Sequence, residues 1–111
     1  MSWSMFEAGR TLGEIGPRSG RILRDDVHAN GARITLEEGA PQAPYVITCS
    51  IQHPAVEHVY ATRASGTAAR VFNAMKADLE TLQRLIRAQD CSAEARARVA
   101  AAVDQFVSAY R

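Results

Sequence analysis

The sequence lacks the features that mark several classes of protein. It has only two cysteines, Cys49 and Cys91, and they do not form a C-x-x-C pair, so neither a zinc ribbon nor a redox motif is indicated. It has no apolar run of about 18 residues, the length that a membrane-spanning helix needs, and no secretory h-region near its start. We therefore expect a cytoplasmic protein with two free thiols, because a reducing compartment keeps cysteines unpaired.

An excess of charge is also missing. The 13 basic residues are nearly matched by 12 acidic ones, which leaves a formal net charge of +1. A dedicated nucleic-acid binder carries a clear basic surplus, because neutralisation of phosphates supplies most of its affinity. Weak nucleic-acid binding is therefore the third-ranked hypothesis. It depends on arginines that could line a groove near the helix ends: Arg63, Arg70, Arg84, Arg87, Arg96 and Arg98.

The strongest structural signal is the segment Pro44–Ile51, which is dense in β-branched and aromatic residues and is typical of a central strand. A tight turn at residues 52–55 should pair it with a second strand, Val56–Thr62. In this register Cys49 lies opposite His58. The alternation of side chains places one set on the core face of the sheet: Tyr45, Ile47, Cys49 and Ile51.

A second hairpin is predicted around Asn30-Gly31, because both central positions of a type I′ turn need positive φ. Its strands would be Arg21–His28 and Ala32–Glu37. A two-residue loop pairs Val27 with Ile34 and Arg24 with Glu37, and it turns Asp25 toward the core. We expect a bulge near Asp25-Asp26 to relieve that conflict.

From Thr67 onward the apolar period changes from two to 3.6 residues, which predicts a helix that ends near Ala88. Ser92 should cap a second helix, whose buried side is expected to comprise Ala95, Val99, Val103, Phe106, Val107 and Tyr110. The fold class is α+β: a four-stranded antiparallel meander sheet with two C-terminal helices packed on one face. Residues 20–111 form this single domain. Residues 1–19 form an N-terminal arm that is either flexible or a short helix, and its Trp3 and Phe6 could dock on the domain.

Two side-chain pairs could carry chemistry. Cys49 opposite His58 is a candidate catalytic pair, because a neighbouring imidazole lowers the pKa of a thiol and accepts its proton. A buried cysteine is more often inert, so the sequence assigns no catalytic residue. Asp26 and His28 point the same way from one strand and are candidate metal ligands, but a third ligand is missing. A Gly-rich phosphate loop, a G-x-S-x-G elbow and an H-E-x-x-H helix are absent, and no cofactor is expected.

The leading hypothesis is a non-enzymatic protein–protein interaction or regulatory module that forms a homodimer. A small enzyme or ligand binder that uses Cys49 and His58 is the alternative. Helices can cover only one face of the sheet, and part of the other face is too apolar for free exposure. We expect the dimer to form along the edge of the last strand or at this face, around Val46, Thr48, Val59 and Ala61.

Overall fold

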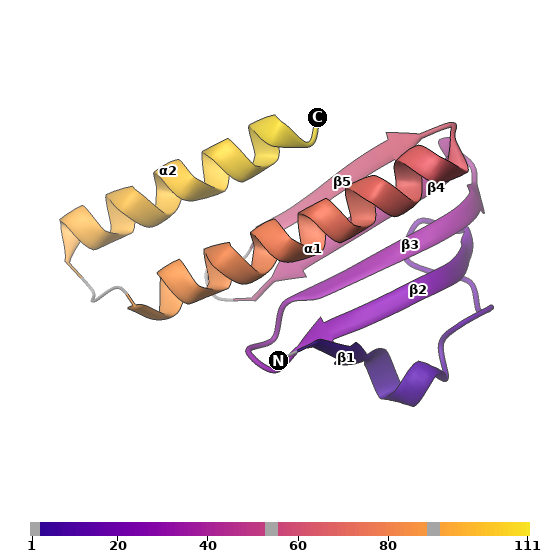
Figure 1. Ribbon diagram of the computed structural model, residues 1–111, viewed down its shortest axis with the longest axis horizontal. Helices are drawn as coiled ribbons and strands as arrows, with labels where there is room; N and C mark the ends of the chain where they lie inside the picture. Colours follow the sequence, from indigo (N-terminus) through magenta and orange to yellow (C-terminus); the bar gives the residue numbers. More distant parts are fainter. Residues whose placement is uncertain (1–2, 53–55, 89–91) are drawn as a thin grey trace.

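The computed structural model describes residues 3–52, 56–88 and 92–111 and has two layers (Figure 1). One layer is an antiparallel sheet of five strands in the order β1-β2-β3-β4-β5, and the other contains both C-terminal helices. The α+β class is therefore confirmed, whereas the predicted number of four strands is wrong. The elements are β1 (Trp3–Met5), β2 (Arg21–His28), β3 (Arg33–Ala40), β4 (Ala43–Ile51), β5 (Val56–Thr62), α1 (Ser65–Ala88) and α2 (Ala93–Ala109).

The additional strand belongs to the N-terminal arm. β1 pairs with the end of β2 and leads into a 3-10 helix, η1 (Phe6–Gly9). The indole N–H of Trp3 donates to Glu80 of α1 at 3.2 Å, and the Trp3 ring meets His28 edge-on with centroids 5.1 Å apart. The Phe6 ring covers the guanidinium of Arg33 at 3.7 Å. Both aromatic side chains thus attach the arm to the domain.

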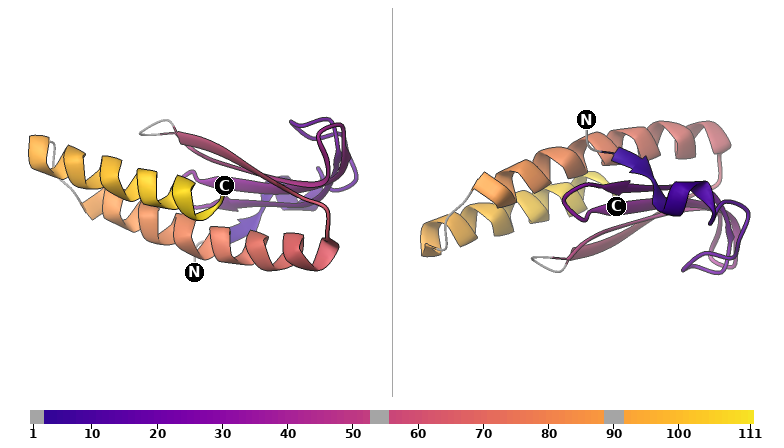
Figure 2. Two further views of the ribbon diagram at one scale, coloured as in Figure 1. Left: turned by 90° about the horizontal axis from the view of Figure 1, so that it is seen from above. Right: turned by 90° about the horizontal axis from the view of Figure 1, so that it is seen from below.

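The core lies between α1 and the sheet, and Figure 2 shows α1 crossing one sheet face. The predicted apolar stripe of α1 is confirmed: Phe72, Met75 and Leu79 are fully buried, and they pack against Ile34 and Ile47. Ser92 caps α2 as expected, because its hydroxyl accepts the N–H of Ala95 at 3.1 Å. The α2 stripe is only partly covered. Three valines that were expected to be buried are half-buried: Val99, Val103 and Val107.

The predicted register of the first hairpin is wrong by one residue. The N–H of His28 donates to the carbonyl of Ala32, and the N–H of Gly31 donates to the carbonyl of His28, so the loop has three residues. Gly31 supplies the positive φ of 103° that such a loop requires. Asp26 is therefore opposite Ile34, and the β2 side chains from Arg24 to His28 lie on the other face from the one predicted.

Polar partners explain this register. Arg24 and Asp26 face α1, where Arg24 donates to Asn73 at 3.1 Å and Lys76 donates to Asp26 at 2.8 Å. The predicted Arg24–Glu37 pair is consequently wrong. The bulge lies between Ile22 and Arg24 rather than near Asp25-Asp26.

The opposite face of the sheet is partly covered by residues 10–20, which we name the covering segment. The buried carboxylate of Glu37 accepts the backbone N–H groups of Arg18 and Gly20, the latter at 2.9 Å. Asp25 is buried on the same face, where Arg33 donates to both of its oxygens and Thr11 donates to one. Burial of a carboxylate is tolerated when hydrogen bonds replace its water. The covering segment supplies those of Glu37, and Asp25 receives its hydrogen bonds from Arg33 of β3 and from Thr11 of the covering segment.

Candidate functional site

Among the described residues, β5 is the last strand of the sheet and pairs with β4 alone. Its pairing with β4 agrees with the predicted register: Cys49 is opposite His58, and Ile47 is opposite Tyr60. β5 is seven residues long. An edge strand of this length presents a row of backbone donors and acceptors to any chain that can lie beside it.

In an antiparallel ladder, hydrogen-bonded pairs of residues alternate with non-hydrogen-bonded pairs. The hydrogen bond from the N–H of His28 to the carbonyl of Ala32 therefore fixes which neighbouring strand each backbone group points to, strand by strand, as far as β5. By this alternation the backbone N–H and C=O groups of Thr35 point to β4, those of Ile47 point to β5, and those of Tyr60 point back to β4. The N–H and C=O groups of the intervening β5 residues face outward. We name these groups the β5 edge: Glu57, Val59 and Ala61.

Within the described part of the chain, the β5 edge has no backbone hydrogen-bond partner. The strand also lacks proline and lysine, the residues that commonly guard an edge against pairing. The opposite edge of the sheet differs, because β1 has only three residues and the covering segment bonds to the start of β2 through Ile22. The β5 edge is thus the longer of the two edges of the sheet, and Glu57 is the one charged side chain on it.

The four residues predicted to form an interface lie in two environments. Val46 is fully buried and Thr48 is 7% exposed, and the Arg18 side chain lies over Thr48 at 3.4 Å. The expectation of an uncovered face at these two positions is wrong, because the covering segment occupies it. Val59 is half-buried and Ala61 is exposed, and both belong to the β5 edge.

Cys49 and His58 are opposite each other but do not form a thiolate–imidazole pair. The ring Nε2 of His58 is directed to the carbonyl of Tyr110, 2.5 Å away, and the ring packs edge-on to Phe106. Burial raises the pKa of the Cys49 thiol to about 12, and a hydrogen bond with the backbone of His58 offsets only part of that rise. A nucleophilic cysteine requires a lowered pKa, so this environment opposes nucleophilic chemistry at Cys49.

Cys49 is therefore expected to alkylate slowly in the native protein. In a Cys91→Ser variant, the thiolate fraction alone makes native labelling at pH 8 about 10³-fold slower than labelling in denaturant. The native rate should rise about tenfold per pH unit from pH 8 to pH 10 without a plateau. Rapid labelling of Cys49 at pH 8 would restore the candidate catalytic pair. Cys91 lies outside the described residues, and its faster reaction stays a sequence-based prediction.

The candidate metal ligands Asp26 and His28 already have partners. Asp26 binds Lys76, and Nδ1 of His28 accepts the N–H of Asn30 at 3.0 Å. Among the described residues, no group of three or more His, Cys, Asp or Glu side chains could hold a metal ion. The two side chains instead join β2 to α1 and to Trp3 of the arm.

The arginines proposed for nucleic-acid binding are exposed but lie in two groups. Arg63 and Arg70 are near the start of α1. Arg84 and Arg87 are near its other end, where α2 begins with Arg96 and Arg98 (Figure 1). Arg70 and Arg84 are roughly 21 Å apart along the helix at about 1.5 Å per residue. A single basic groove is therefore not formed by all six.

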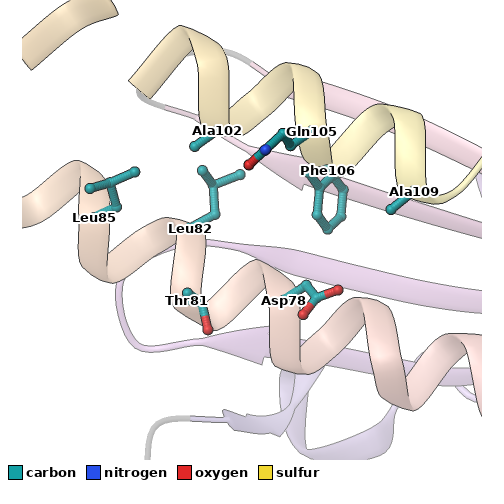
Figure 3. Close-up of a pocket in the computed structure, with 8 residues that line it drawn as sticks. All are labelled: Asp78, Thr81, Leu82, Leu85, Ala102, Gln105, Phe106 and Ala109. Atoms are coloured by element: carbon teal, nitrogen blue, oxygen red, sulfur yellow. The ribbon is translucent and has the colours of Figure 1, made fainter. Parts of the chain in front are cut away.

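A groove of about 370 Å³ separates α1 from α2. Figure 3 shows that Leu82 of α1 and Phe106 of α2 both point into the space between the two helices. Both are core residues, so the groove is the surface of the seam between the two helices. Its rim includes Asp78, whose carboxylate accepts the Tyr110 hydroxyl. This bond fixes the end of α2 against α1.

Comparison of the sequence and the structure with family models, curated proteins and solved structures gives no match. Across the described residues, every helix is too short or too polar to cross a bilayer. The functional conclusion therefore rests on the geometry of the β5 edge.

Proposed function

We propose that this protein is a non-enzymatic protein-binding module that takes up an extended segment of a protein partner along β5. The observation that carries the proposal is the run of outward backbone groups at Glu57, Val59 and Ala61, which have no partner in the described part of the chain. In strand addition, main-chain hydrogen bonds provide affinity and side-chain contacts provide specificity.

The surroundings of β5 support this proposal over an enzymatic one. The thiol pKa of Cys49 is raised rather than lowered, and the ring of His58 is directed to the carbonyl of Tyr110. The His58 ring therefore links β5 to the end of α2, and Cys49 is a buried thiol of the core. The same free thiol favours the cytoplasm as the setting.

A Val59→Pro variant tests the proposal. Because the N–H of Val59 points outward, proline at this position removes a donor from the β5 edge while leaving the ladder to β4 intact, as edge strands tolerate. We expect wild-type protein to capture one or more proteins from a lysate of its native host, and we expect Val59→Pro to lose them. Quantitative mass spectrometry of the two captures measures the difference.

The matched control is Val59→Thr, which keeps both the N–H and the β-branched shape of the residue and should keep the captured proteins. Thermal unfolding of all three proteins establishes that they are folded. Equal capture by wild-type protein and a folded Val59→Pro variant would contradict strand addition at β5.

A further inference from the structure

We infer that the strand that pairs with β5 is β5 of a second copy, in an antiparallel register centred on Tyr60. This inference rests on the proposed function, because it names the partner of the same edge. It follows from the distribution of charge along the segment Glu57–Arg63, which is self-complementary.

The charges lie at equal distances from Tyr60. Glu57 and Arg63 are each three positions from it, and Val59 and Ala61 are each one position away. Glu57, Val59 and Ala61 carry the outward backbone groups of β5, and Arg63 is the first residue after the strand, where the chain bends toward α1. When the segment meets a second copy about a two-fold axis at Tyr60, Glu57 lies opposite Arg63 and Val59 lies opposite Ala61.

In this register the outward backbone groups of the β5 edge gain hydrogen-bond partners. Val59 of each copy lies opposite Ala61 of the other, and each of these two hydrogen-bonded pairs exchanges two N–H···O bonds. Opposite charges that face each other across strands stabilise the pairing, whereas like charges oppose it. A register centred on Val59 would place Glu57 opposite Ala61, and one centred on His58 would place Glu57 opposite Val59. In either case both Glu57–Arg63 pairs would be lost.

The two charged side chains are accessible for this role. The Glu57 side chain is 61% exposed although Arg18 lies 3.2 Å from one of its oxygens. Arg63 is exposed and directly follows the strand, and within the described part of the chain it forms no ion pair. A second copy would give Arg63 a partner and would use the free side of Glu57.

On the helix side of the sheet, the same axis passes through Tyr60. Tyr60 is half-buried and packs against the edge of the core, so two copies of Tyr60 would meet as an aromatic cross-strand pair. The contact is isologous, since each copy contributes the same residues. It would join the two five-stranded sheets into one continuous sheet.

Reversal of the two charges tests both the partner and the register. Analytical ultracentrifugation should show a reversible dimer for the wild-type protein. Glu57→Arg alone and Arg63→Glu alone each place like charges opposite one another, and each is expected to raise the dimer Kd at least tenfold. The double variant Glu57→Arg/Arg63→Glu restores opposite charges and is expected to return the Kd to within about threefold of the wild-type value.

Arg18→Gln is the matched control, because it removes the contact of Arg18 with Glu57 within one copy and should leave the dimer Kd within about twofold. Single variants that dimerise like the wild type, or a double variant as weak as the single ones, would overturn the register. A wild-type protein that remains monomeric near 1 mM would overturn self-pairing. If the wild-type protein is monomeric, capture of partner proteins that Val59→Pro abolishes would still support the proposed function. Capture that Val59→Pro does not affect would contradict both the proposed function and self-pairing.

Discussion

Replacement of Phe72 by alanine is expected to cost about 3–5 kcal/mol of unfolding free energy, the range seen when a buried aromatic side chain is truncated. Phe72 is fully buried in the core between α1 and the sheet. Its ring also lies 4.1 Å from the guanidinium carbon of Arg24. The truncation therefore leaves a cavity and removes a cation–π contact. Urea denaturation of the two proteins measures the change.

The control for this experiment is Arg70→Ala on the exposed side of α1, which should change the stability by no more than about 0.5 kcal/mol. A loss below about 1 kcal/mol for Phe72→Ala would contradict the packing of α1 on the sheet.

Replacement of Asp25 by alanine is expected to cost about 2–3 kcal/mol, at or just below the range of about 3–5 kcal/mol for a broken buried ion pair. The Asp25 side chain is fully buried, while that of Arg33 is 36% exposed, so water relieves part of the loss. Hydrogen bonds with Asp25 raise the pKa of Arg33, and the variant loses them. Arg33 nevertheless keeps its charge, because a guanidinium without those bonds is still strongly basic. Thr11 also loses its acceptor, which loosens the covering segment.

Glu7→Ala provides the comparison, because Glu7 and Arg10 form an exposed ion pair at 2.8 Å. Exposed pairs contribute about 0–1 kcal/mol, so this variant should unfold almost like the wild type. Equal losses for Asp25→Ala and Glu7→Ala in urea denaturation would contradict the account of Asp25 as an anchor of the covering segment.

The elements that were predicted correctly from the sequence each have one dominant pattern of apolar residues. The alternation in β4 and β5 gave the right register, because an error of one residue would have turned Ile47 and Ile51 away from the core. The long apolar stripe of α1 was equally informative. The first hairpin was predicted wrongly because Asn30-Gly31 fits a two-residue turn, whereas the contacts of Asp26 with Lys76 and of Asp25 with Arg33 favour a three-residue loop.

The candidate site was only partly predictable for a different reason. Val59 and Ala61 were expected to be near an interface, and the structure identifies them as edge residues. The burial of Val46 depends on the covering segment, whose backbone N–H groups bind Glu37 from 17 and 19 positions away. That contact has no local pattern in the sequence. The three-residue β1 is likewise too short to show a period.

Amide hydrogen exchange resolved by residue tests the central claim most directly, because the claim concerns alternate N–H groups of one strand. In dilute protein, the amides of Glu57, Val59 and Ala61 should exchange quickly, while those of His58 and Tyr60 are protected by β4. As the protein concentration rises from micromolar to millimolar, exchange at Val59 and Ala61 should slow in parallel with dimer formation. Fast exchange of these two amides at every concentration would contradict pairing along the β5 edge.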